Sequence, residues 1–184
     1  MEPFTIRPAH TGDAASIGRL DVETWQAAYA GILATPYLVE LSAERRERGW
    51  AGVIRREPRD VRVAVGPDGA ILGFGSCGGC RDEPNYTGEV FTLYVAPDWQ
   101  NRGIGRALIL SLFARLVERG TRSAVVWVLS ENPSRFFYQR LGGREIRRRM
   151  LPFAGAQVAA TAFGWPDLPQ YLSAIASGEH QPEP

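Results

Sequence analysis

The stretch of this chain best suited to chemistry is Gln-Asn-Arg-Gly-Ile-Gly-Arg at residues 100–106. It follows a predicted strand and opens an amphipathic pattern that is typical of a helix. Gly103 and Gly105 let the main chain approach a ligand without a side chain in the way. The first amides of a helix have no intrahelical partner, and the helix dipole places partial positive charge beside them. These features predict a site for a phosphate or diphosphate, with Arg102 and Arg106 adding charge.

Two common nucleotide-binding motifs do not fit this stretch. The phosphate loop of nucleoside triphosphatases requires a lysine, and all 21 basic residues of this chain are arginine. The dinucleotide fingerprint needs a third Gly or Ala where Leu108 stands, and it expects the glycines directly after the strand. By itself, a Gly-x-Gly turn more often merely begins a helix. A second motif is therefore needed to decide what the turn binds.

Hydrophobic periodicity gives a coarse map of the elements that must position this turn. Alternating patterns predict strands, and patterns that repeat every 3.6 residues predict helices. The expected strands cover residues 4–7, 60–65, 70–76, 89–95, 123–129, 144–150 and 157–163, and the expected helices cover residues 13–30, 35–54, 106–119 and 133–141. This order is typical of an α+β fold with a mixed central sheet of about seven strands flanked by about four helices.

Two motifs in order resemble one known family. A strand ending in Leu-Tyr-Val, then a proline, then Gln-x-x-Gly-x-Gly before a helix resembles the acetyl-coenzyme A motif of the GCN5-related (GNAT) N-acetyltransferase superfamily. Residues 132–142 resemble that family's second hallmark, an Asn followed by Phe-Tyr-x-x-x-Gly. Ile-Arg-Pro-Ala at residues 6–9, with Trp25 and Tyr29 after it, is also similar to family members. The resemblance extends over roughly residues 4–165.

The resemblance implies a particular domain organisation and co-substrate. It implies a single GNAT-like domain over residues 1–165, with strands that splay apart at the cofactor site. Residues 166–184 are polar and contain several prolines, so we expect a partly disordered C-terminal tail with one helical turn. The family's co-substrate is acetyl-coenzyme A (acetyl-CoA), and we expect it here.

Matching positions carry over a set of cofactor-binding residues. Main-chain groups of Leu93 and Val95 are implied to bond the pantetheine arm, and amides of residues 100–106 to hold the diphosphate. Asn132 is implied to contact the pantetheine. The full set is Leu93, Tyr94, Val95, Gln100, Asn101, Arg102, Gly103, Ile104, Gly105, Arg106, Asn132, Ser134 and Phe137.

Two residues are candidates for catalysis. The resemblance places Tyr138 facing the thioester sulfur, where its hydroxyl can protonate the departing thiolate. If the cofactor strand alternates regularly, Glu89 lies on the same face as Phe91, Leu93 and Val95. Some family members have a catalytic Glu at this spacing before the same Val. Glu89 is our first choice for the base that deprotonates the amine, with Glu23 and Glu83 as alternatives. Structural roles remain open for both, as a core tyrosine and as a solvated carboxylate.

The sequence gives little information about the acceptor. Trp25 and Tyr29 stand at helical spacing, which is more often typical of core residues, yet the family's acceptor pocket is often lined from this region. They are weak candidates for substrate binding. Asp82 and Glu83 can attract a cationic amine, although surface carboxylates are common. A small-molecule amine and a peptide amine both remain open.

The composition excludes several classes of partner. The 21 basic and 20 acidic residues give a formal net charge of +1, so neither nucleic acid nor an anionic membrane is expected to bind. No apolar run reaches the ~20 residues of a membrane helix, and the N-terminus lacks a signal-peptide pattern, so a cytoplasmic location is expected. We expect no metal, because Cys77 and Cys80 have no histidines at ligand spacing. Family members often dimerise, so a homodimer is a further expectation.

The expected activity is therefore transfer of an acetyl group from acetyl-CoA to an amine, by direct attack in a ternary complex. A non-catalytic acyl-CoA-binding module or sensor of the same fold is the first alternative. Another nucleotide-dependent enzyme, which would bind NAD or ATP instead, is the second.

Overall fold

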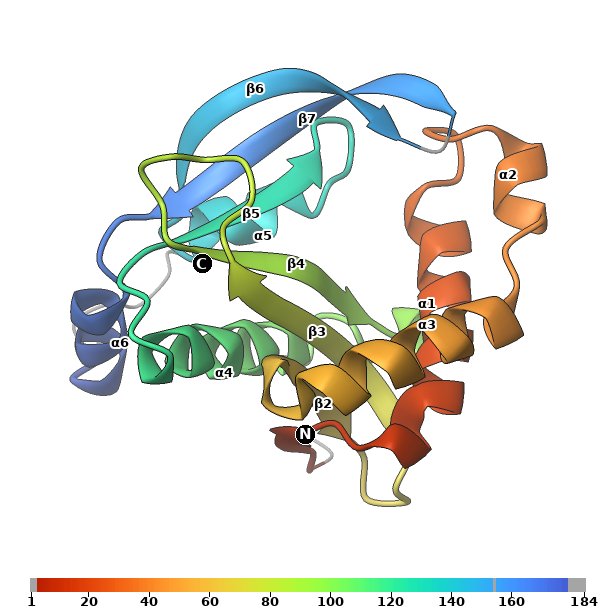
Figure 1. Cartoon of the computed structure of the whole chain (residues 1–184), viewed down its shortest axis with the longest axis horizontal. Helices are drawn as coiled ribbons and strands as arrows, with labels where there is room; N and C mark the ends of the chain where they lie inside the picture. The colour runs from red at the N-terminus through yellow and green to blue at the C-terminus, as the bar shows by residue number, and fades with distance from the viewer. Residues whose placement is uncertain (1–2, 154, 179–184) are drawn as a thin grey trace. The chain divides into compact units, whose positions relative to one another are not determined.

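The computed structural model of the chain describes residues 3–153 and 155–178 (Figure 1). Within these ranges it forms one seven-stranded mixed sheet with the strand order β1-β2-β3-β4-β5-β7-β6. The strands are β1 (Thr5–Pro8), β2 (Val61–Val65), β3 (Ile71–Gly79), β4 (Gly88–Val95), β5 (Ala124–Leu129), β6 (Arg144–Phe153) and β7 (Ala156–Trp165). The helices are α1 (Ala14–Ala28), α2 (Thr35–Val39), α3 (Ala43–Arg56), α4 (Ile104–Glu118), α5 (Arg135–Arg140) and α6 (Leu168–Ala176). The predicted α+β class is confirmed.

The chain folds into two compact units. The first consists of Met1–Ser76 and Thr92–Leu112, and the second of Cys77–Phe91 and Phe113–Pro184, of which the structure describes the ranges given above. Strands β3 and β4 and helix α4 therefore each contribute residues to both units.

The first unit has a helical layer on each face of its strands. Helices α1 and α3 lie side by side (Figure 1), and Gly18 allows their close approach because a Cβ there would lie 2.7 Å from the Glu47 nitrogen. Ile17 and Ile54 from these helices are buried against Phe74 of β3. A separate apolar cluster joins α4 to the strands, and it consists of Ala64, Leu72, Ile104 and Leu108, with Leu93 and Val95 packed against it.

Two predictions for the first unit had different outcomes. The strands expected over residues 60–65 and 70–76 are confirmed as β2 and β3, and the turn between them has a Gly66 N–H bond to the Ala70 carbonyl at 2.9 Å and Gly69 at a φ of +83°. The single helix expected over residues 35–54 was wrong, because the chain forms α2 and α3 instead. Ser42 explains the break: its hydroxyl accepts the Arg45 N–H at 3.2 Å and caps the second helix.

The second unit is built on the antiparallel strands β5, β7 and β6, which lie next to one another in that order (Figure 1). The parallel register of β4 with β5 joins Gly88–Val90 to Ala124–Val126, and β4 has eight residues in all. Only three of the eight residues of β4 therefore pair with β5, as expected for two strands that splay apart.

Helix α6 is longer than the single turn expected in the tail. Asp167 caps it by accepting the Gln170 N–H at 3.0 Å. Tyr171 then packs edge-on against Phe113, with ring centroids 5.9 Å apart, and Leu168 is fully buried. This tertiary burial, which local propensity does not reveal, explains the extra length. Residues 179–184 of the predicted tail lie outside the described residues.

None of the helices in the described parts of the chain is both long enough and apolar enough to cross a membrane.

Candidate active site

The turn before α4 has the backbone shape that an anion site requires. Asn101 has a φ of 59° and Gly103 a φ of 80°, so two residues of the turn are left-handed within three positions. Alternation of this kind points successive N–H groups toward one side and forms a concave anion site. The Ala107 N–H makes a helical bond to the Gly103 carbonyl at 3.0 Å. Because α4 begins at Ile104, the amides of residues 104–106 in its first turn have no intrahelical acceptor and can bond an anion.

Neighbouring side chains hold this turn in place. The guanidinium of Arg102 stacks over the Trp99 ring, 4.7 Å from its centroid, and a stacked arginine keeps its charge beside the turn. The Gln100 amide nitrogen donates to the Val95 carbonyl at 3.3 Å and ties the turn to the end of β4. Free amides, left-handed backbone and a nearby guanidinium together fit a diphosphate.

The three residues at the end of β4 point to alternate sides. Leu93 and Val95 pack toward α4, whereas Tyr94 packs against the cluster formed by α1 and α3. All three are half-buried. This alternation follows from the pleat of a strand.

Tyr94 contacts one of the two residues that the sequence offered for acceptor binding, namely Trp25 in α1 and Tyr29 directly after it. The hydroxyls of Tyr29 and Tyr94 are hydrogen-bonded at 3.2 Å. Tyr29 in turn packs edge-on against Trp25, with ring centroids 5.1 Å apart. Burial is the main cause that raises the pKa of Tyr29, so this phenol stays protonated and can donate a hydrogen bond. Trp25, Tyr29 and Tyr94 thus form one aromatic cluster that carries two hydroxyl groups.

Asp21, one helical turn before Trp25, was not among the residues predicted from the sequence. Its side chain is 2% exposed and accepts the Trp50 indole N–H at 2.8 Å. The Arg46 guanidinium lies 3.6 Å from the same carboxylate. Burial raises the pKa of Asp21 despite these partners. The available signal was the spacing of four residues between Asp21 and Trp25, which places both on one helix face.

The second motif forms a compact link between β5 and α5. Asn132 is buried, and its side-chain oxygen accepts the Ser134 N–H at 2.8 Å, which fixes the start of α5. Tyr138 is buried in α5, where its ring contacts Phe137 at 5.2 Å and stacks on Phe163 at 6.0 Å. The sequence-predicted residues of this motif therefore lie together.

Glu89 does not share the face of Leu93 and Val95, so the prediction from regular alternation was wrong. A Cβ on the preceding Gly88 would contact Leu116 of α4, so Glu89 points away from the helix against which Leu93 and Val95 pack.

Glu89 is also not the solvated carboxylate of the structural alternative. It is 2% exposed and accepts three hydrogen bonds from Arg81. The main-chain N–H donates at 3.2 Å and the Nε at 3.1 Å, while a terminal guanidinium nitrogen holds the other carboxylate oxygen. Arg81 thus bonds both carboxylate oxygens of Glu89. Nothing in the sequence identified Arg81 as this partner.

Neither cysteine forms a disulfide within the described residues: Cys77 is buried, and the Cys80 thiol donates toward the Glu83 carbonyl at 3.5 Å. Among the described residues, no group of three or more His, Cys, Asp and Glu side chains could hold a metal ion.

Comparison of the chain with known proteins identifies its family. The FR47-like protein family matches residues 77–151. The uncharacterized N-acetyltransferase YuaI of Bacillus subtilis (strain 168) is 33% identical over 165 residues, which cover 89% of this chain and 94% of YuaI. The chain belongs to the GNAT N-acetyltransferase superfamily.

Solved structures show the same fold. PaiA N-acetyltransferase from Thermoplasma acidophilum, determined in complex with coenzyme A, superposes with a TM-score of 0.65 at 20% identity, over 86% of this chain and 98% of that one. A GCN5-related N-acetyltransferase from Rhodopseudomonas palustris gives 0.67 at 23% identity, over 89% and 96%.

Proposed function

We propose that this protein transfers an acetyl group from acetyl-CoA to the amino group of an acceptor. The observation that carries the proposal is the turn at residues 100–106, where left-handed Asn101 and Gly103 precede the free amides of α4. Such a turn fits the diphosphate of a coenzyme A thioester. Its place in a GNAT chain makes acetyl-CoA the proposed donor.

The remaining binding roles follow the family motifs. Main-chain groups of Leu93 and Val95 bond the pantetheine arm as an added strand would. Asn132 contacts the same arm, with Ser134 and Phe137 beside it. The acceptor, a small-molecule or peptide amine, contacts Trp25 of α1 and Tyr29 at its C-terminal end.

The proton balance sets what catalysis requires. An alkylamine has a pKa of about 10.4, so its free base costs about 4.6 kcal/mol at pH 7. We assign Glu89 as the base that takes this proton once Arg81 has moved from it. The neutral amine then attacks the thioester carbon directly, and no covalent enzyme intermediate forms.

The leaving group needs a proton in return. A thiol has a pKa of about 8.5 and a tyrosine one of about 10, so transfer from Tyr138 to the thiolate is uphill by only about 2 kcal/mol. Tyr138 is therefore an adequate general acid. Main-chain N–H groups near Leu93 polarise the thioester carbonyl during attack.

An amine-library screen that follows free thiol release tests the proposal. The expected result is protein-dependent release of coenzyme A that requires an acceptor. Binding of acetyl-CoA without turnover on any amine would instead indicate a non-catalytic sensor. Competition by NAD or ATP with no binding of coenzyme A would reject the proposed donor.

A further inference from the structure

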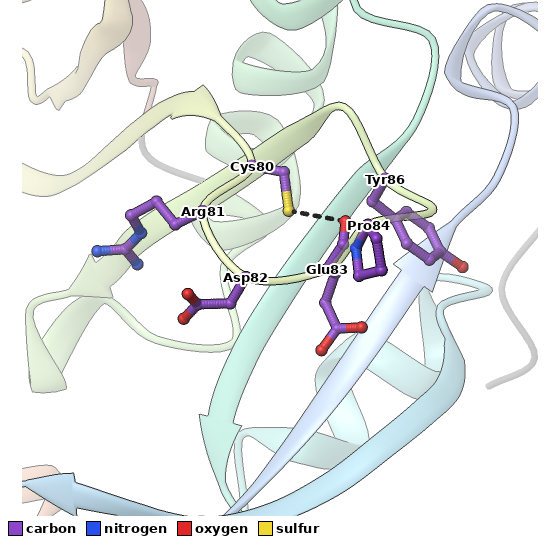
Figure 2. Close-up of a pocket in the computed structure, with 6 residues that line it drawn as sticks. All are labelled: Cys80, Arg81, Asp82, Glu83, Pro84 and Tyr86. Carbon is purple, nitrogen blue, oxygen red and sulfur yellow. Dashed lines mark hydrogen bonds between the residues drawn. The ribbon is translucent and has the colours of Figure 1, made fainter.

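The loop that joins β3 to β4 covers part of the sheet of the second unit. We call Cys80–Tyr86 the strap. A hollow of about 430 Å³ is lined by Cys80, Arg81, Asp82, Glu83, Pro84 and Tyr86. Figure 2 shows that Arg81 points away from Glu83 and Tyr86, while the carboxylates of Asp82 and Glu83 extend to the same side of the loop. The strap thus presents charge of opposite sign in two directions.

The strap lies over one face of the sheet, which the strand registers define. Residues opposite one another in neighbouring strands point to the same side. Three rows share this face, and they are Glu89–Val125–Gly164–Arg144, Trp127–Ala162–Arg147 and Leu129–Ala160–Arg149. The residues of the central strand β7 in these rows are small. A Cβ on Gly164 would collide with the ring of Tyr86, so the strap rests directly on the backbone there.

On this face the strap supplies a cation to Glu89. Arg81 donates three hydrogen bonds to that buried carboxylate and also stacks over Phe91, 4.4 Å from its ring centroid. Yet the Arg81 side chain is 63% exposed. Because the Arg81 side chain is exposed, it can leave Glu89 without losing buried contacts of its own, and the ammonium group of a ligand can then pair with this carboxylate.

The strap also supplies anions to two arginines of β6. Asp82 pairs with Arg149 at 2.8 Å, and Glu83 pairs with Arg147 at 3.1 Å. The Asp82 side chain is 56% exposed. Ion pairs this exposed contribute little to stability, so exchange of Asp82 for another anion costs little.

Two hydrogen-bond donors on the same face have no acceptor among the described residues. The Nε of Arg149 and the indole Nε1 of Trp127 are buried and have no hydrogen-bond partner among the residues that the structure describes. The Arg149 guanidinium lies over the Trp127 ring, 4.2 Å from its centroid. A carboxylate has two oxygens and about four lone-pair positions, so it can satisfy donors that Asp82 leaves unused.

We propose that the strap occupies the place of the acceptor, and that the acceptor is an amine that also carries a carboxylate. Its ammonium group replaces Arg81 at Glu89, and its carboxylate replaces Asp82 at Arg149. This inference rests on the proposed function, in which Arg81 leaves Glu89 and Glu89 then takes the proton of the amine. Arg149 becomes the residue that selects the acceptor.

The test compares amines in pairs. Each ω-amino acid from glycine to 6-aminohexanoate, and several α-amino acids, are assayed beside the alkylamine that lacks the carboxylate. Wild type, Arg149→Gln and Arg148→Gln are measured by thiol release, with acetyl-CoA binding followed by calorimetry. Arg148 is the matched control, since it is opposite Thr161 on the other face of β6 and pairs with Glu145.

We expect at least one amino acid to exceed its alkylamine by tenfold or more in kcat/KM. That preference should disappear in Arg149→Gln, through a higher KM, and persist in Arg148→Gln. Equal or better use of the alkylamines, or a preference that survives Arg149→Gln, would overturn the inference while leaving acetyl transfer intact. Normal acetyl-CoA binding with no turnover on either kind of amine would also overturn it. Absence of acetyl-CoA binding would instead refute the proposed function.

Discussion

In the turn before α4, the proposed ligands of the diphosphate are main-chain amides, whereas on the face under the strap the proposed ligands of the acceptor are side chains. The turn needs only its own backbone and one neighbouring arginine, stacked on Trp99. Under the strap, Glu89 is paired with Arg81 and Arg149 with Asp82. One region is open to its ligand, and the other is filled by a segment of the chain itself.

This difference assigns separate tasks to the two regions. The positions of main-chain amides are set by the backbone, so side-chain substitutions do not change their ligand preference. Such a site suits a donor that is common to a whole family. Exposed ion pairs can be exchanged one for one, which suits the choice of an acceptor. Changes in the turn should therefore affect acetyl-CoA affinity, and changes under the strap should affect the acceptor.

The largest effect is expected from Gly103→Asp. The new carboxylate repels the diphosphate, while Asp tolerates a positive φ better than most residues, so the fold should persist. We expect acetyl-CoA affinity to fall roughly a hundredfold, equivalent to about 2.8 kcal/mol. Gly69→Asp is the matched control, because Gly69 has a φ of +83° and equally open surroundings. Equal loss of binding in both variants, measured by calorimetry, would mean that charge at the turn is irrelevant.

The next effect concerns turnover. Tyr138→Phe keeps the ring that stacks on Phe163 and removes only the proton donor. Loss of a general acid should lower kcat about a hundredfold and leave the acetyl-CoA dissociation constant within about twofold. Steady-state kinetics with an identified acceptor measure this. An unchanged kcat would remove Tyr138 from the mechanism.

Glu89→Gln should act on the acceptor step alone. Without the base, kcat/KM for the amine should fall by about tenfold or more at pH 7, and the acidic limb of its pH profile should be lost. Glu118→Gln removes an exposed carboxylate that pairs with Arg115 and should keep the wild-type profile. Retention of the same acidic limb in Glu89→Gln would assign the proton to another group.

The smallest effect is expected from loosening the strap. Asp82→Asn removes an exposed ion pair, so the free energy of unfolding should change by less than about 1 kcal/mol. Trypsin should nevertheless cleave faster after Arg81, and the acceptor KM should decrease a few-fold because the strap competes less well. Glu145→Gln, which breaks the exposed Arg148 pair, should change neither quantity. A strap that stays equally protected in Asp82→Asn would show that this pair does not hold it.

The sequence predicted the parts of the molecule whose signals are local. The glycines at 103 and 105 and the Asn-to-Gly run at 132–142 each carry their geometry within a dozen residues, because turns and helix starts depend on adjacent residues. The α+β class followed from periodicity for the same reason. The break between α2 and α3 depended on one cap, Ser42, within a continuous apolar pattern.

The charge pairs were beyond the sequence because they join distant segments. Asp82 and Arg149 are 67 positions apart, and their pairing depends on the β6–β7 register. Three arginines stand in a row at residues 147–149, and two of them pair with carboxylates of the strap. A run of like charges does not reveal which of its members faces an opposite charge across the fold.

The most direct test of the central claim is an amide-resolved NMR titration of the labelled protein with coenzyme A. The account predicts that the N–H signals of Ile104, Gly105 and Arg106 shift strongly and saturate together, while that of Gly69 stays in place. Saturable binding of coenzyme A that leaves those three amides unmoved would contradict the claim that they hold its diphosphate.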